Sequence, residues 1–293
     1  LANEIDSENA KRQSMEKEIS KSACEIIERN GYNHNRVIVV CGKNWHSGVL
    51  GIVAARITEK YGRPSIIMTE EDGVCHGSGR SFKGFNLHDA LSFCGNLLLK
   101  FGGHELAAGM SIEKENIEDF RKRINIYALN NGNSVPELNI DFKINPAALN
   151  LDMAYSVKAL EPFGNSNPVP VFAVLDCEIV RIMPLSSGKH TKLLLNKGNT
   201  SFQALAFGVK TDEFCFNAGE KIDVAICVGI NEFKGEHNLS VQIKGIRPSG
   251  FKEEEYFNSL FSLDDYLSGL KESSSEITPT REEVGIVYKK IIG

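Results

Sequence analysis

The sequence predicts an α/β domain followed by an all-β barrel, with a helix before them and a partly helical extension after them. Three observations predict this order. Strand-like and helix-like segments alternate over residues 31–131, which is typical of an α/β domain. A polar segment marked by glycine and proline, residues 130–138, then interrupts the alternation. Five strand-like runs follow within residues 138–248, each bounded by turn-forming residues.

The N-terminal segment, residues 1–30, has a thin stripe of apolar residues near helical spacing, including Ile19, Ala23 and Ile27. Charged residues occupy most other positions. We interpret this segment as a long amphipathic helix that connects the α/β domain to another domain. Because the chain starts at Leu1 rather than at methionine, we expect it to be a piece of a longer protein.

Strands and one helix are predicted in the first half of the α/β domain, residues 31–131. β-branched and other apolar residues favour strands in "RVIVVCG", "RPSIIMTE" and "VCHGSGRS". The spacing of apolar residues predicts a helix over residues 47–62. Ser47 is its expected N-cap and Gly62 its expected stop.

A second helix is predicted over residues 87–100, with Asn86 as its N-cap. In this interpretation Gly102 or Gly103 ends the helix by taking the left-handed conformation. A strand in "AAGMSIE" and a last helix in "ENIEDFRKRINIYALN" complete the domain.

The second domain, residues 138–248, is predicted to be a small barrel of the oligonucleotide-binding (OB) type, because it packs five strand-like runs into about 80 residues. The runs are "VFAVLDCEIVRIMPL", "KHTKLLLN", "SFQALAFGV", "KIDVAICVGINEF" and "NLSVQIKGIRP". This architecture supports many functions, so it does not define one by itself. Residues 249–293 are acidic and end in a predicted helix capped by Thr280. An acidic tail that docks a partner and a plain linker to a further domain are both open for this extension.

Composition excludes several classes of protein. No apolar run approaches the roughly 18 residues of a membrane span, and the first residues do not form a secretory signal. The seven cysteines form no CxxC pair, so we expect reduced thiols in a cytoplasmic protein and no zinc site. The net charge of −5 argues against a general polyanion binder. Residues 31–248, however, contain 23 lysines and arginines against 22 acidic residues, which leaves room for a local basic groove.

Two histidine-containing segments are candidate sites. "NWHSGVLG" places His46 at the entry of a helix, where amide groups favour anions. The alternative there is a Trp45 packed under the domain with His46 as a cap. "FGGHELAAG" places His104 after Gly102 and Gly103, which let a phosphate approach the backbone. His104 has no partner at metal-ligand spacing, so it is a candidate to hydrogen-bond a phosphate, not to bind a metal.

The segment "HGSGRSFKGF" brings together two glycines, two hydroxyls and a guanidinium, which are the donors that a phosphodiester needs. We take as candidates Ser78, Gly79, Arg80, Ser81 and Lys83. The alternative is a glycine-rich hairpin with a solvated arginine. We find no set of clustered aspartates and histidines that predicts a metal centre in this chain.

Four segments, "NWHSGVLGIVAARITEKYGRPSII", "GSGRS", "FNLHDAL" and "FGGHELAAGMSI", resemble the DHHA1 domain of the DHH phosphoesterase superfamily. In order and spacing they resemble the RecJ family of single-stranded-DNA-specific exonucleases. "LEPFGNSNPVPVF" is similar to the phrase that leads into the OB domain of that family, and residues 1–30 are similar to its connecting helix.

The resemblance implies a 5′-to-3′ exonuclease of DNA repair and recombination that uses Mn²⁺ or Mg²⁺, held by a DHH domain to which nothing in this sequence corresponds. We therefore expect no metal in this chain and no nuclease activity from it alone. The resemblance implies that His104 reaches the scissile phosphate, that Gly102 and Gly103 open the backbone, and that Arg80 holds a phosphate together with Ser78 and Ser81.

In the barrel, residue type alone suggests contacts with single-stranded DNA by Lys192, Phe207, Phe233 and Lys234. A single-strand-binding protein or a helicase is an expected partner class, and no membrane is expected. Two other functions stay open. One is a non-catalytic nucleic-acid-binding module. The other is a DHH-type phosphodiesterase acting on short oligonucleotides or cyclic dinucleotides.

Overall fold

The computed structural model describes residues 2–132, 135–164 and 166–271. These residues form two compact units. Unit 1 contains the described residues up to Glu137 together with residues 253–271, and unit 2 contains those from Leu138 to Lys252. The helix predicted from Thr280 lies outside the described residues.

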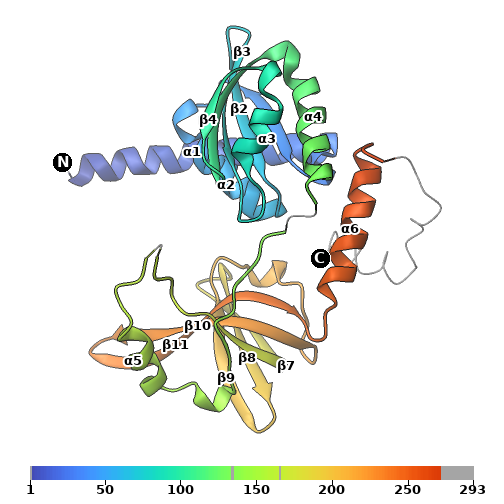
Figure 1. Ribbon diagram of the computed structural model, residues 1–293. Coiled ribbons are helices and arrows are strands. Elements are labelled where there is room, and N and C mark those ends of the chain that lie inside the picture. Colours follow the sequence, from blue (N-terminus) through green and yellow to red (C-terminus); the bar gives the residue numbers. More distant parts are fainter. Residues whose placement is uncertain (1, 133–134, 165, 272–293) are drawn as a thin grey trace. The chain divides into compact units, whose positions relative to one another are not determined.

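Unit 1 is a five-stranded sheet between two layers of helices (Figure 1). The strand order is β1-β2-β3-β5-β4, in which β1 and β2 are parallel and the other pairs antiparallel. The strands are β1 (Ile38–Lys43), β2 (Ser65–Glu71), β3 (Val74–Arg80), β4 (Leu98–Gly103) and β5 (Ala107–Glu113). The helices are α1 (Ala2–Asn30), α2 (Leu50–Tyr61), α3 (Leu87–Phe93), α4 (Ile117–Asn130) and α6 (Glu253–Leu267).

Each face of this sheet has its own apolar core. Helices α1 and α2 cover one face through residues such as Ile27 and Val53, which pack with Ile38 of β1. Helices α3 and α4 cover the other through residues such as Leu91 and Phe120. The predicted N-terminal helix is thus confirmed, and Ile19, Ala23 and Ile27 of its apolar stripe are buried.

Among the predicted caps, those at Asn86 and Gly62 are confirmed and the one at Ser47 is wrong. The Asn86 side chain accepts a hydrogen bond from the Asp89 amide at the start of α3. Gly62 ends α2 in the left-handed conformation, with φ of 62°. Ser47 is not the N-cap, because a 3₁₀ turn (Ser47–Val49) precedes α2. The cap of that turn is His46, whose Nδ1 accepts from the Gly48 amide at 3.1 Å.

The helix predicted over residues 87–100 is wrong in its second half. Helix α3 ends at Phe93, and residues 98–103 form the edge strand β4, paired with β5. A run such as "NLLLK" suits either structure, and pairing with a strand distant in sequence decides between them. Gly102 and Gly103 therefore end a strand, and neither is a helix cap.

Unit 2 is a closed barrel of five strands, and each of the five predicted runs contributes one. The barrel order is β7-β8-β9-β11-β10, and β10 closes it by pairing with β7. The strands are β7 (Phe172–Leu185), β8 (His190–Lys197), β9 (Thr200–Ala206), β10 (Lys221–Phe233) and β11 (Glu236–Pro248), with a short β6 (Phe142–Lys143) beside β7. Helix α5 (Leu151–Lys158) adds Ala154 and Val157 to the barrel core.

Six short 3₁₀ turns connect these elements where the structure describes the chain. They are η1 (Tyr32–His34), η2 (Ser47–Val49), η3 (Gly95–Leu97), η4 (Lys114–Asn116), η5 (Pro146–Ala148) and η6 (Thr211–Glu213). Among the described helices, none combines the length and apolar character needed to span a membrane.

Candidate nucleic-acid interface

Strand β3 carries glycines on one side and the polar residues Ser78 and Arg80 on the other. A Cβ atom on Gly77 would lie 2.5 Å from Cγ of Met68, and one on Gly79 would lie 2.7 Å from Cδ2 of Leu87. Both glycines therefore make room for the core on the α3 and α4 side. The backbone of Gly79, one of the candidates, is not open to a phosphate, because this residue is buried and pairs with strands on both sides.

The other side of β3 carries Ser78 and Arg80. Nη1 of Arg80 donates to Oγ of Ser78 at 3.1 Å and to the carbonyl of Gly79 at 2.8 Å. A Cβ atom on Gly51, in the first turn of α2, would lie 2.7 Å from Nη2 of Arg80 and 3.2 Å from Oγ of Ser78. The guanidinium thus lies across the start of α2, and we call Gly51, Ser78 and Arg80 the Arg80 cluster.

Gly51 is a residue that the motif analysis missed. The position could have been noticed because a glycine inside an otherwise regular helix costs about 1 kcal/mol relative to alanine. The exposed His46 and Gly48 lie one turn earlier, at the beginning of the same helical segment. Amide groups at the start of a helix favour an anion, and a half-buried guanidinium beside them adds charge-assisted donors. Trp45 is buried at 8% exposure and His46 caps the turn that follows it, so the structure agrees with the packing alternative for this segment, and anion binding at His46 stays a prediction.

The loop that carries His104 begins beside the end of β3. Arg80 pairs with Ala107 of β5, and the His104 amide donates to the Ala107 carbonyl at 2.8 Å. Gly103 has φ of 149°, and a Cβ atom there would lie 2.4 Å from the Ala107 oxygen. The turn therefore requires glycine at position 103, whereas a Cβ on Gly102 would meet nothing within 4 Å. His104 itself is exposed.

The remaining candidates of this segment are Ser81, which is hydrogen-bonded within the fold, and Lys83, which is exposed. The Ser81 hydroxyl donates to the Phe85 carbonyl at 2.8 Å, and the Ser81 amide donates to the Leu106 carbonyl at 2.9 Å. Ser81 thus ties the segment after β3 to the loop of His104, and its hydroxyl is used in that turn. Lys83 is exposed at the outer part of this segment.

In unit 2, Lys192 belongs to a row of paired residues on the outer surface of the barrel. Lys192 pairs with Leu205, Leu205 with Gln242, and Gln242 with Cys227. Paired residues share a face of the sheet, and the neighbours Leu193 and Leu195 of β8 point into the core. We call these four paired residues, Lys192, Leu205, Gln242 and Cys227, the barrel row.

The aromatic candidates of the barrel lie at different places. Phe207 follows β9, is 51% exposed, and contacts the His190 ring edge-to-face at a centroid distance of 5.3 Å. His190 is two residues before Lys192 on β8, so Phe207 lies near the barrel row. Lys234 lies in the exposed turn between β10 and β11, at the tip of this hairpin and away from Phe207 and the barrel row. Phe233 precedes it, and its side chain lies outside what the structure describes.

A cavity of about 360 Å³ adjoins the barrel row. It is lined by Gln242 and Cys227 of the row, and also by Lys158 of α5, Phe163 and Lys244. The strand pairing slips at Lys244, because Ala225 pairs with Gly245 and Ile226 with Ile243. Such a bulge redirects a side chain. Sequence reasoning missed these residues, since they come from the β10–β11 hairpin and from α5 and the segment after it, which only tertiary packing brings together.

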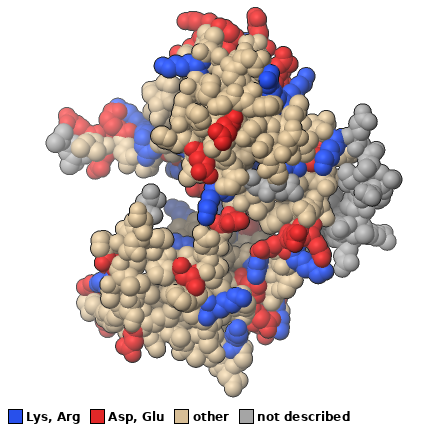
Figure 2. All heavy atoms as spheres, in the orientation of Figure 1, with Lys and Arg blue, Asp and Glu red and all other residues tan. Residues whose placement is uncertain are grey.

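The charges of both units are mixed. Figure 2 shows lysine and arginine side chains interspersed with aspartate and glutamate on the face drawn. Among the described residues, no group of three or more histidine, cysteine, aspartate or glutamate side chains is arranged to hold a metal ion.

The cysteines agree with the sequence prediction, since all seven are free. Burial raises the pKa of the Cys41 thiol to about 12, and the contact of its Sγ with Cys75 Sγ at 3.3 Å adds to this shift. Burial also raises the pKa of Cys94 and Cys177 to about 11. These thiols are protonated core residues and not nucleophiles.

Comparison with known proteins matches both units to described domain families. Residues 34–129 match the DHHA1 domain, and residues 140–245 match the RecJ OB domain. The chain is 29% identical to the single-stranded-DNA-specific exonuclease RecJ of Bacillus subtilis, over 99% of this chain and 39% of that protein. It is 31% identical to RecJ of Escherichia coli, over 85% of this chain and 45% of that protein. The chain thus spans less than half the length of these relatives.

Solved structures give the same result. The crystal structure of RecJ from Thermus thermophilus in complex with Mn²⁺ superimposes with a TM-score of 0.70 and 26% identity, over 85% of this chain and 36% of that one. The complex with Mg²⁺ gives a TM-score of 0.69 over 85% of this chain and 38% of that one. Because the two domain families match consecutive parts of the chain and the relatives match across both, the chain belongs to the RecJ family and contains its DHHA1 and OB domains.

Proposed function

We propose that this chain is the DNA-binding part of a 5′-to-3′ single-stranded-DNA exonuclease that acts in DNA repair and recombination. The observation that carries the proposal is the Arg80 cluster. A guanidinium that donates to Ser78 and lies across the start of α2 presents donors to a phosphate oxygen. The barrel that follows in the same chain offers an outer row with lysine, glutamine and a nearby exposed phenylalanine.

We assign the roles of the residues from their chemistry and, for His104, from the resemblance to the RecJ family. Arg80 binds a phosphate of the strand, and Ser78 holds the guanidinium in its orientation. His104, exposed on the turn that Gly103 makes possible, hydrogen-bonds the phosphate region where cleavage takes place. Phe207 stacks on a base, and Lys192 pairs with the DNA backbone.

The metal of the reaction is expected outside this chain. The relatives from Thermus thermophilus were solved with Mn²⁺ or Mg²⁺. The described residues offer no group of three or more side chains that could hold a metal ion. When bound, such an ion lowers the pKa of a water for attack on phosphorus. We propose that the ligands lie in a DHH domain of the full-length protein and that this chain alone does not cleave DNA.

Binding of labelled oligonucleotides, followed by fluorescence anisotropy, tests this function. The chain should bind single-stranded DNA more tightly than duplex of the same length, and the affinity should fall linearly with salt on a logarithmic scale. Arg80→Ala should weaken binding while leaving the thermal unfolding midpoint unchanged, because Arg80 is half-buried and its hydrogen bonds are local. Equal affinity for duplex and single strand would contradict the proposal.

Two related questions have their own tests. In the full-length protein, Arg80→Ala should abolish most of the exonuclease turnover, and normal activity would exclude Arg80 as a phosphate ligand.

We also propose a single-strand-binding protein or a helicase as the class of protein partner, which co-purification with the full-length protein tests. A phosphodiesterase for cyclic dinucleotides is less well supported, because the OB domain match extends over residues 140–245.

A further inference from the structure

Two arginines precede the neighbouring parallel strands β1 and β2 at the same end of the unit 1 sheet. Ile38 of β1 pairs with Ser65 of β2, and Arg36 and Arg63 each precede their strand by two residues. Both are buried, with 7% and 5% exposure. Burial lowers the pKa of Arg63, and the charge of Arg36 acts in the same direction. Two buried cations fixed together by strand register need counter-charges of matching geometry.

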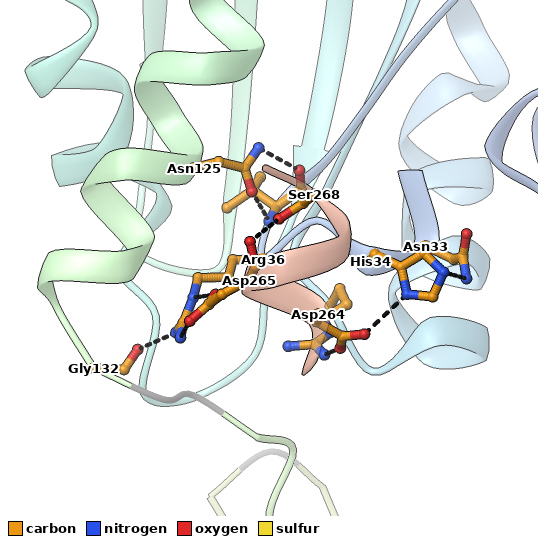
Figure 3. Close-up of polar contacts among 10 residues, drawn as sticks. Asn33, His34, Arg36, Asn125, Gly132, Asp264, Asp265 and Ser268 are labelled. Atoms are coloured by element: carbon orange, nitrogen blue, oxygen red, sulfur yellow. Dashed lines mark hydrogen bonds and ion pairs between the residues drawn. The ribbon is translucent and has the colours of Figure 1, made fainter. Parts of the chain in front are cut away.

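Helix α6 supplies these counter-charges (Figure 3). Nε and Nη2 of Arg36 donate to the two carboxylate oxygens of Asp265 at 2.6 and 2.9 Å. Arg63 pairs with Asp264, whose other oxygen lies 2.9 Å from Nδ1 of His34. The aspartates are 5% and 1% exposed, so both carboxylates are removed from water, and they are paired with His34, Arg36 and Arg63.

An aromatic residue completes the docked face of α6. Phe261 is 3% exposed, and its ring centroid lies 4.9 Å from Cζ of Arg36 and 4.3 Å from Cζ of Arg63. Residues 261, 264 and 265 follow one another at the spacing of one helix face. Contacts with an aromatic ring and with paired carboxylates fix a guanidinium in place and make the docking specific.

The position of α6 in the chain gives this docking a consequence. Unit 2 lies between two parts of unit 1 in the sequence, since residues 138–252 are followed by α6. Four residues, 249–252, separate the end of β11 from the start of α6. While α6 is docked, the barrel is attached to unit 1 at both of its ends. When α6 is released, the barrel is attached only through the segment before Leu138.

We infer that α6 is a latch that tethers the barrel to unit 1 and thereby raises the affinity for single strands long enough to contact both units. This inference rests on the proposed function. A strand held by unit 1 meets the barrel at an effective concentration set by the tethers, and a second short tether confines the barrel to a smaller volume. The latch adds no DNA contact of its own, so strands that fill only one site gain nothing from it.

The test compares two oligonucleotides and two ways of opening the latch. The first is Asp264→Asn together with Asp265→Asn, which removes the carboxylates and leaves residues 2–137 of unit 1 unchanged in sequence. The second is a protease recognition site inserted between Phe251 and Lys252, which allows the tether to be cut while α6 keeps all its docking residues. The probes are single strands of roughly 6 nucleotides, within the site of one barrel, and roughly 25 nucleotides. Glu254→Gln, on an exposed part of α6, and the uncut insertion are the controls.

Both openings should weaken binding of the long strand by roughly tenfold and leave binding of the short strand unchanged. Small-angle scattering should show a broader distribution of sizes for both, and neither control should differ from the parent. Unchanged affinity of the cut chain for the long strand would overturn the inference while leaving the proposed function intact. Equal losses for both strands would also overturn it, since that result assigns α6 a role in one binding site. Absence of binding by the parent chain to either strand would remove the proposed function itself.

Discussion

The guanidinium of Arg80 occupies the space that a side chain on Gly51 would need, because a Cβ atom there would lie 2.7 Å from Nη2. The contact joins strand β3 to the first turn of helix α2. It explains why the helix contains glycine where alanine would stabilise it by about 1 kcal/mol.

Gly51→Ala should therefore separate stability from DNA binding. The new methyl group displaces the flexible end of Arg80, so the chain should fold with an unfolding midpoint at or above that of the parent. Affinity for single-stranded DNA should fall by about tenfold, which corresponds to the loss of a charge-assisted hydrogen bond of about 1.4 kcal/mol. Ile52→Ala, at an exposed position in the same turn, is the control. Parent-like affinity in Gly51→Ala would show that Arg80 is not held for binding.

The two glycines before His104 should respond differently to substitution. Gly103→Ala places a Cβ atom 2.4 Å from the Ala107 oxygen at φ of 149°, so it should lower the free energy of unfolding by about 2 kcal/mol. Gly102→Ala meets no atom within 4 Å and should change it by less than about 0.5 kcal/mol. Urea unfolding of both variants measures the difference. Equal effects would contradict the turn geometry assigned to Gly103.

The exposed ring of Phe207 should contribute to DNA binding by the barrel. Phe207→Ala is expected to weaken binding of single-stranded DNA by about 1–2 kcal/mol, the usual value for one base stacked on an aromatic side chain. Phe142, which is 65% exposed and stacks on Phe172, belongs to the same unit but not to the barrel row. Phe142→Ala is therefore the matched control in anisotropy titrations. A loss in Phe142→Ala as large as that in Phe207→Ala would argue against a site at the barrel row.

Folding stability should fall at alkaline pH because of the buried thiols. Burial raises the pKa of Cys41 from 9.0 to about 12, so the folded state favours the protonated thiol. The stabilisation is complete below the pKa of the unfolded chain and is lost as pH rises from there towards the folded value. Burial raises the pKa of Cys94 and Cys177 as well, and so acts in the same direction.

Urea midpoints measured between about pH 8 and about pH 10.5 check this dependence. Cys41→Ala should reduce the slope, whereas Cys215→Ala, at an exposed position, should leave it unchanged. A stability that stays constant over this range would show that these thiols are accessible to solvent.

Local patterns were sufficient for most of the fold. The strands of the barrel follow from alternation, as in β8, where Leu193 and Leu195 are buried and Lys192 is not. The caps at Asn86 and Gly62 were also readable, since a cap depends on a few consecutive residues. The strand β4 was not, because the same leucine run fits a helix until β5 supplies hydrogen-bond partners.

The candidate site was predictable only in part. Residue types pointed to Ser78 and Arg80, and the structure places them together. Nothing local marked Gln242, which joins Lys192 in the barrel row only through the pairing of β9 with β11, or Lys244 in the adjoining cavity. For the acidic extension the sequence predicts only a tail or a linker, since it offers no sign of what the charges of this segment face.

The sequence by itself determined the order of the domains, the barrel strands and the identity of the phosphate-binding candidates, because periodicity, turn residues and side-chain chemistry are local properties. The tertiary structure alone decided that Gly51 lies beneath Arg80 and that Asp265 meets Arg36, 229 positions away in the chain. Such contacts depend on strand register and on which helix face is buried, and both are settled only when distant segments pack against each other.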